Sequence, residues 1–224
     1  GVILPAAEIC RRAKAEGIMT IIDGAHVPAH IPLDIRDMDP DYYTGALHKW
    51  LCCPKGISFL YVKREHQDEI QPMVKSWGWG EEYDRFKDST QLHGESRFIN
   101  VFQWQGTRDM SAFFTVPEAI RFQADHDWDA VRQRCIESVR SIRDEVTAMT
   151  GLPKICPDDW LGQMATILFP SGDVTAFKKS LYHDHGIEMP TMAPDGHSGF
   201  RVSINGYNTD EDVDHLLKTL KRFL

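Results

Sequence analysis

The sequence predicts an α/β protein made of two successive domains. Segments with the apolar spacing of helices alternate with short, nearly continuous apolar runs, which is the pattern of strands connected by helices. The first such run, at 18–22, ends directly in Asp23 and Gly24. A second alternation of strands and helices fills the later part of the chain. We therefore expect a first domain over residues 1–118 and a small α/β domain over residues 119–224.

Residues 5–17 are predicted to form the first helix, because Pro5 suits a first helical position and Gly17 suits a stop. The apolar run at 18–22 that follows is typical of a buried parallel strand. Its carboxyl end delivers Asp23, and in open α/β sheets ligands bind at that end of the strands. Asp23 is therefore the first candidate site residue.

The pattern repeats more loosely in the rest of the first domain. Residues 42–45 favour a strand, and residues 57–62 form a clearer one after a proline and a glycine. Residues 63–105 are predicted to be a long loop with short elements, and a loop of that length in a compact domain is usually functional. Its aromatic residues Trp77 and Trp79 are expected to pack rather than to belong to the site.

From residue 117 onward the predicted elements become more regular. In order they are a helix at 117–125, a helix at 128–149, a strand at 164–169, a helix at 174–185, an extended segment at 187–189, a strand at 200–204 and a final helix that begins at Thr209. Gly151 and Gly186 suit the ends of two of these helices. In the last helix the Thr209 hydroxyl can cap the backbone while Asp212 completes a capping-box pattern.

Composition and charge exclude several classes of protein. The chain of 224 residues has no apolar run near the ~20 residues that span a bilayer, so we expect no membrane partner. Its net charge is -8 and its 25 basic residues form no stripe, which argues against binding of nucleic acid. The five cysteines include no CxxC pair, which disfavours a disulfide framework or a metal site and indicates a reducing cytoplasm.

Two residues gain meaning when they are considered together. Asp23 alone has a simple interpretation as a cap or turn residue, and Lys49 alone as an exposed lysine. An acid at one strand end and a lysine among aromatic residues after the next strand are, as a pair, what a pyridoxal cofactor requires. The lysine attaches the cofactor as a Schiff base, and the acid keeps the pyridine nitrogen protonated.

Three stretches carry a resemblance to a known family. They are IDGAH at 22–26, DYYTGALHKW at 41–50 and PKG at 54–56. In this order they resemble the class V aminotransferase family of pyridoxal-phosphate enzymes, and the DGAH and HKW forms are most similar to its isopenicillin N epimerase-like branch. The resemblance covers essentially the whole chain. It implies fold type I, with the later half of the large cofactor-binding domain over 1–118 and the small C-terminal domain over 119–224.

The resemblance implies roles for single residues around the cofactor, pyridoxal 5′-phosphate. Lys49 matches the Schiff-base lysine, and Asp23 matches the partner of the pyridinium nitrogen. His26 matches the residue that hydrogen-bonds the cofactor's phenolic oxygen, and His48 matches the residue that reaches its phosphate. Without the neighbouring acid and lysine, each histidine would more often be a satisfied polar residue.

Two further positions extend the match along the chain. Gly106 and Thr107 match a motif whose threonine contacts the phosphate from the other subunit, which implies a homodimer. Arg201 matches the arginine that holds the substrate α-carboxylate, and a planar guanidinium suits that role because it binds a carboxylate bidentately. Outside this motif Arg201 would be interpreted as a surface arginine that extends its charge into water.

The implied reaction takes place at the α-carbon of an amino-acid-like substrate. Epimerisation or transamination is expected, and elimination by a pyridoxal-phosphate lyase is an alternative. Desulfurase chemistry is disfavoured, because the stretch at 188–199, where desulfurases carry a catalytic cysteine, has none.

Two alternatives of other kinds remain open. The chain begins at Gly1, without the N-terminal section in which family members supply a phosphate loop and an aromatic ring stacked on the cofactor. We therefore expect a C-terminal portion of an enzyme, which could be catalytically incomplete by itself. A cofactor-free α/β binding domain is the third hypothesis, and it would have to contain the acid, histidine, lysine, threonine and arginine series by chance.

Overall fold

The computed structural model describes residues 1–76, 96–170, 172–192 and 198–224. The chain divides into two compact units, which we call the N-terminal unit (Ala6–Ile120) and the C-terminal unit (Gly1–Pro5 with Arg121–Leu224). Some of the positions considered in the sequence lie outside the described residues, namely Trp77, Trp79 and residues 193–197 of the cysteine-free stretch.

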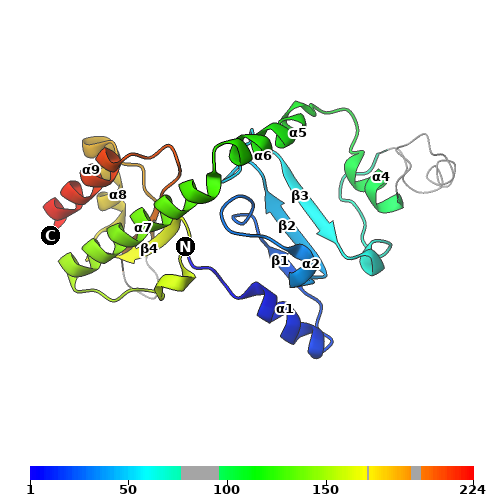
Figure 1. The fold of residues 1–224 in the computed structure, drawn as a ribbon, viewed down its shortest axis with the longest axis horizontal. Helices are drawn as coiled ribbons and strands as arrows, with labels where there is room; N and C mark the ends of the chain where they lie inside the picture. Colours follow the sequence, from blue (N-terminus) through cyan, green and yellow to red (C-terminus); the bar gives the residue numbers. More distant parts are fainter. Residues whose placement is uncertain (77–95, 171, 193–197) are drawn as a thin grey trace. The chain divides into compact units, whose positions relative to one another are not determined.

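The N-terminal unit contains a three-stranded sheet in the order β1-β2-β3 (Figure 1). Strand β1 (Ile21–Asp23) pairs in parallel with β2 (Tyr42–Ala46), and β2 pairs antiparallel with β3 (Ser58–Val62). Because β1 and β2 are parallel, their carboxyl ends lie at the same edge of the sheet. The sequence therefore folds so that the segments following these two strands are neighbours.

Helices and single turns complete the N-terminal unit. In chain order they are α1 (Ala6–Ala15), α2 (Ile35–Met38), η1 (Arg64–His66), α4 (Arg97–Gln103), α5 (Ser111–Phe114) and the first half of α6 (Val116–Asp125), which continues past the last residue of this unit, Ile120. Gly17 adopts a φ of 68° just after α1, as its predicted role as a helix stop requires. The short helix α2 begins where the Asp34 carboxylate accepts hydrogen bonds from two backbone amides of the first turn.

The C-terminal unit contains a second sheet, which is antiparallel and has the order β4-β6-β5. Its elements are α7 (Trp128–Thr150), η2 (Asp158–Trp160), β4 (Met164–Leu168), α8 (Val174–His185), β5 (Thr191–Met192), β6 (Gly199–Ser203), α9 (Asp210–Leu220) and η4 (Lys221–Phe223). The predicted capping box of the last helix is present, because Thr209 and Asp212 bond each other's backbone amides. Gly151 and Gly186 end α7 and α8 in the left-handed region.

One large cluster of buried side chains holds the C-terminal unit together. Helix α7 contributes Val139, Ile142 and Val146, each 0% exposed. Helices α8 and α9 add further apolar side chains to the same cluster. The strands contribute alternate residues to it, namely Ala165, Ile167, Phe200 and Val202. Since side chains alternate along a strand, the intervening residues of β4 and β6 face away from this core.

The first strand differs from its prediction. It begins at Ile21 rather than at Ile18, and Ile18, Met19 and Ile21 are 61%, 53% and 76% exposed. The prediction of a buried strand is therefore wrong for the described residues. The reason is that β1 pairs only with β2 and forms an edge of the sheet, where its apolar side chains remain accessible. The extended segment predicted at 187–189 belongs to neither a helix nor a strand and leads into β5, which begins at Thr191.

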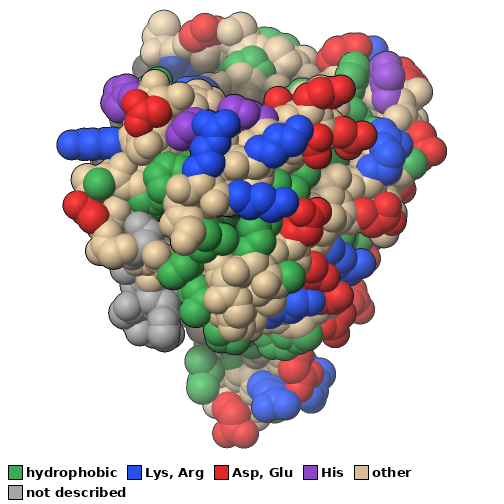
Figure 2. Space-filling view, turned by 90° about the vertical axis from the view of Figure 1, so that its left-hand side faces the viewer, with side chains coloured by type: hydrophobic (Ala, Val, Ile, Leu, Met, Phe, Trp, Pro, Cys, Tyr) green, Lys and Arg blue, Asp and Glu red, His purple; other side chains and the backbone are tan. Residues whose placement is uncertain are grey.

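The surface carries charges of both signs. Figure 2 shows the side on which α8 and α9 lie in Figure 1, and there Lys and Arg are interspersed with Asp and Glu. Within the described ranges, no helix combines the length and the apolar character needed to cross a bilayer. All five cysteines are free thiols.

Candidate active site

The parallel pairing of β1 and β2 brings the two predicted catalytic residues to one edge of the sheet. Asp23 is the last residue of β1 and lies opposite Thr44 of β2. Lys49 follows in the turn after β2 and is half-buried. In the part of the chain that the structure describes, no carboxylate pairs with its amine. The lysine amine is therefore free to bond a ligand.

A tight turn holds Asp23 at this edge. Its Oδ1 accepts a hydrogen bond from the Ala25 amide at 3.0 Å, which is the geometry of an Asx turn. The Gly24 amide donates to the Thr44 carbonyl at 2.9 Å and continues the pairing of the strands beyond β1. Asp23 is exposed, and its Oδ2 accepts no hydrogen bond from the described residues. One carboxylate oxygen thus fixes the turn while the other remains open.

The stacked rings of Tyr43 and Phe59, which we call the aromatic platform, explain why a glycine follows Asp23. A Cβ at Gly24 would lie 1.9 Å from the Tyr43 hydroxyl oxygen, closer than any side chain allows. Tyr43 is 1% exposed, and its ring stacks on Phe59 with the centroids 5.9 Å apart. Burial first, and then the charge of Asp23, raise the pKa of Tyr43 to about 12, so the phenol is neutral at physiological pH. Tyr43, which the sequence did not single out, therefore restricts the position after Asp23 to glycine.

Trp50 links the two segments that carry the predicted histidines. Its indole N–H donates to His26 Nδ1 at 3.3 Å, and its ring stacks on His30 with centroids 4.2 Å apart. Because Nδ1 accepts this bond, the ring hydrogen of neutral His26 resides on Nε2. That tautomer can donate to an oxygen, as the predicted role of His26 requires. Trp50 was not predicted as a site residue, although it directly follows Lys49 in the motif.

His48 has a different hydrogen-bonding state. Its Nδ1 lies 3.2 Å from the Ile57 carbonyl oxygen, and since a carbonyl only accepts, Nδ1 carries a hydrogen. In the neutral ring Nε2 is then an acceptor, and it donates only when the ring is doubly protonated. A contact between His48 and a phosphate would therefore be a contact with the imidazolium.

The Gly106–Thr107 pair lies in the loop between α4 and α5. Gly106 has a φ of 89°, a conformation that favours glycine, and Thr107 is exposed. No hydrogen bond or ion pair between described residues joins Thr107 to Asp23 or Lys49. The structure therefore leaves Thr107 available on the surface of the unit.

Arg201 lies in the C-terminal unit, on β6. It sits directly opposite Thr166 of β4, on the face of the sheet that points away from the core. The side chain is half-buried, and its Nε is buried without an acceptor among the described residues. No carboxylate of the described residues pairs with the guanidinium either.

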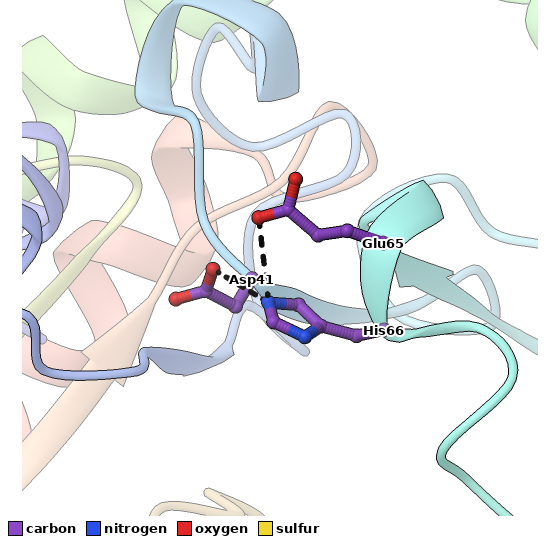
Figure 3. Close-up of side chains that lie close together, drawn as sticks. All are labelled: Asp41, Glu65 and His66. Carbon is purple, nitrogen blue, oxygen red and sulfur yellow. Dashed lines mark hydrogen bonds and ion pairs between the residues drawn. The ribbon is translucent and has the colours of Figure 1, made fainter.

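A cluster of potential metal ligands lies at the opposite ends of β1 and β2. Asp41, Glu65 and His66 each offer a ligand atom, and these atoms lie within 4.8 Å of one another (Figure 3). They line a pocket of about 210 Å³. The Asp41 carboxylate is already engaged: Oδ2 accepts from the Thr20 amide and hydroxyl at 2.7 and 3.0 Å, and Oδ1 lies 3.2 Å from His66 Nε2.

The charges around Asp41 favour a structural role for this cluster. The Lys63 amine lies 3.8 Å from Asp41 Oδ1, where it would repel a bound cation. Burial raises the pKa of Asp41, but the hydrogen bonds from Thr20 and His66 and the charge of Lys63 outweigh it and leave the pKa lowered. The network ties the residue before β1 to the start of β2 and to η1.

Comparison with protein-family models decides the family. Residues 1–216 match the model for Aminotransferase class-V. The chain belongs to this family. An isopenicillin N epimerase from Amycolatopsis lactamdurans is 32% identical over 99% of this chain and 56% of its own length. A putative L-cysteine desulfhydrase 1 from Oryza sativa subsp. japonica is 28% identical over 100% of this chain and 49% of its own length. The class-V chain thus spans about half the length of the curated relatives it matches.

A solved structure confirms the fold. The apo cysteine desulfurase from Thermococcus onnurineus NA1 superposes with a TM-score of 0.78 at 19% identity, over 100% of this chain and 56% of its own. The predicted α/β class-V fold is therefore confirmed. The class-V relatives depend on pyridoxal phosphate, so the cofactor predicted from the sequence is that of the family. The roles of the individual site residues stay predictions.

Proposed function

We propose that this chain is the part of a class-V enzyme that carries the cofactor lysine and the carboxylate-binding arginine. The enzyme would act at the α-carbon of an amino-acid substrate. Epimerisation of a substrate similar to isopenicillin N is the reaction we favour, and transamination is the alternative at the same site. The observation that supports this best is the parallel pairing that places Asp23 and Lys49 at one edge of the sheet.

The residues at this edge fit pyridoxal 5′-phosphate. Lys49 offers a half-buried amine. Asp23 offers its Oδ2, because only its Oδ1 accepts the hydrogen bond from the Ala25 amide. His26 has the tautomer that donates to a phenolic oxygen, and His48 can donate to a phosphate as an imidazolium. When bound, the cofactor supplies a sink for the electrons released at the substrate α-carbon.

The chain's own residues would hold the reactants and move the proton. Lys49 would hold the cofactor through its amine until the substrate amine displaces it, and the lysine amine freed by that exchange could then take the proton from the α-carbon as a general base. Asp23 would keep the ring nitrogen protonated through a charge-assisted hydrogen bond. Arg201 would orient the α-carboxylate. Return of a proton to the opposite face of the α-carbon inverts it, which is an epimerisation.

We also propose a cytoplasmic homodimer. The exposed Thr107, next to a glycine in the left-handed region, would contact the cofactor phosphate of a second copy. The five free thiols support a reducing compartment.

Two alternatives are favoured by specific observations. The similarity to a putative L-cysteine desulfhydrase supports a lyase, in which a group leaves the β-carbon after the α-proton. The coverage of about half of each relative supports a chain that is catalytically incomplete without further sequence.

Trapping the cofactor tests the proposal. The purified chain is incubated with pyridoxal phosphate, reduced with borohydride, digested and analysed by mass spectrometry. We expect the pyridoxyl mass on the peptide with Lys49, its loss in Lys49→Ala and its retention in Lys55→Ala, an exposed lysine of the same unit. Labelling of other lysines only, or no labelling, would count against cofactor binding by this chain.

Deuterium exchange separates the reactions. L-amino acids are incubated with the loaded protein in deuterated water, and α-proton exchange and chirality are followed. Exchange with inversion supports epimerisation. Exchange without inversion but with formation of a keto acid indicates transamination, and sulfide release from L-cysteine indicates a lyase.

A further inference from the structure

We propose that Thr166 donates a hydrogen bond to the carboxylate that Arg201 binds, so that the two side chains form one binding pair on the face of β4 and β6 that points away from the core. This inference rests on the proposed role of Arg201 and adds a specificity-determining residue to the substrate site. The ligand class is the carboxylate of an amino acid.

The register of the sheet brings the two side chains together. Thr166 and Arg201 are directly opposite each other on neighbouring antiparallel strands. The Ile204 amide donates to the Gln163 carbonyl at 3.0 Å. Gln163 and Ile204, which lie opposite each other, are therefore a hydrogen-bonded pair of the ladder. Since pair types alternate along the ladder, Thr166 and Arg201, three positions further on, form a non-hydrogen-bonded pair. Side chains of such pairs share one face and approach each other most closely.

Each of the two side chains has a hydrogen-bond donor that meets no strong acceptor among the described residues. The buried Nε of Arg201 meets no acceptor in the described ranges. The Thr166 hydroxyl contacts only the Met192 sulfur, at 3.8 Å, and a thioether is a weak acceptor. A buried donor without an acceptor is costly, so a ligand that supplies acceptors gains from both groups.

A carboxylate fits this donor set. Its two oxygens can accept from Nε and one terminal nitrogen of a guanidinium in a planar, bidentate arrangement. Its remaining lone pairs can accept from the hydroxyl of Thr166. An amide presents one acceptor oxygen and an NH₂ group that would face the guanidinium, so it should bind poorly.

Arginine side-chain NMR tests the pair directly. The probes are L-alanine and L-alaninamide, added to the ¹⁵N-labelled chain with pyridoxal phosphate present. The Arg201 Nε–H signal is identified by its loss in Arg201→Lys. In the parent protein, dissociation constants are determined from the shift of this signal. In the parent and in every variant, they are also determined from the shifts of backbone amides. The values for Thr166→Val, Thr166→Ser and Ser203→Ala are then compared with those of the parent. Ser203 is the matched control, because it lies two residues from Arg201 on the same face of β6 and is exposed.

We expect L-alanine to bind and L-alaninamide to bind far more weakly. Thr166→Val, which keeps the shape but removes the hydroxyl, should weaken L-alanine binding about tenfold, as for a hydrogen bond to a charged group. Thr166→Ser should remain within about twofold of the parent because it keeps that donor. Ser203→Ala should leave the binding unchanged.

The outcomes distinguish the inference from the proposed function. If Arg201→Lys weakens binding and Thr166→Val does not, the inference about Thr166 is wrong and the role of Arg201 stands. If L-alaninamide binds as tightly as L-alanine, or Arg201→Lys has no effect, the proposed role of Arg201 is wrong. Absence of any L-alanine binding by the parent protein overturns both.

Discussion

The two units of the chain differ in how completely they bury their apolar residues. In the described part of the C-terminal unit, one cluster contains 17 buried apolar residues. The corresponding cluster of the N-terminal unit contains three, Leu51, Cys53 and Ile57. The N-terminal sheet also leaves Ile21 and Leu60 76% and 45% exposed on the same face. The C-terminal sheet packs one face against this cluster and also buries Met164 and Leu168 on the other, whereas the N-terminal sheet keeps apolar surface accessible.

The two units therefore differ in how the predicted binding residues relate to the contacts that stabilise the fold. The predicted cofactor residues lie at or just after the ends of β1 and β2, where hydrogen bonds such as Asp23–Ala25 and Trp50–His26 hold the chain. The predicted carboxylate-binding residue, Arg201, projects instead from a strand whose neighbours in sequence are fixed in a packed core. We therefore expect substitutions in the two units to affect stability and binding in different proportions.

The largest expected difference is in the loss of stability when an isoleucine is replaced by alanine in each unit. Ile142→Ala removes a side chain that is 0% exposed from the C-terminal core and should destabilise that unit by about 2–5 kcal/mol. Ile21→Ala alters a side chain that is 76% exposed and should cost less than about 0.5 kcal/mol. Urea unfolding followed by far-ultraviolet circular dichroism measures both. Equal losses would show that the apolar face of β1 is covered in solution and would break the comparison.

A smaller effect should appear at the turn that carries Asp23. In Gly24→Ala the new Cβ would meet the Tyr43 hydroxyl at 1.9 Å, so the turn must move. We expect a loss of about 1–3 kcal/mol, typical of overpacking, together with weaker binding of pyridoxal phosphate. Gly172→Ala is the control, because a Cβ there meets nothing within 4 Å. The platform interpretation fails if the two variants have the same unfolding midpoint and the same cofactor affinity.

Local signals in the sequence predicted the C-terminal unit well. The helix expected at 174–185 is α8 with the same bounds, and the capping box at Thr209 is present. Such features depend on residues within a few positions of one another. The burial of β1 was predicted wrongly because it depends on what packs against the strand rather than on the strand itself. The four-residue helix α2 was missed because it is too short to show a period.

The candidate site was predictable as a set of residues but not as a geometry. The motif order pointed to Asp23 and Lys49, and the parallel pairing of their strands agrees with a shared edge. The contact between Trp50 and His26 joins residues 24 positions apart, and no pattern in the sequence specifies it. The pairing of Thr166 with Arg201 depends on strand register, which a shift of one residue would abolish.

The smallest expected effect concerns an exposed ion-pair cluster that the less buried N-terminal unit uses to tie its elements together. Hydrogen bonds from Lys14 and then Lys63 lower the pKa of Asp39 to about 2. Because this pKa lies below that of an unfolded aspartate, the stabilisation is present above about pH 4 and is lost as the pH falls toward 2. Asp39→Asn should therefore cost less than about 1 kcal/mol at pH 7, the usual range for exposed pairs, and should flatten the loss of stability in acid.

Urea midpoints measured between pH 7 and pH 2.5 test this, with Asp68→Asn as the control, since Asp68 is exposed and forms no ion pair with the described residues. If Asp39→Asn retains the acid dependence of the parent, the lysine contacts do not stabilise the folded chain. The N-terminal unit would then depend on its small core and its sheet pairing alone, and the contrast with the C-terminal unit would be sharper still.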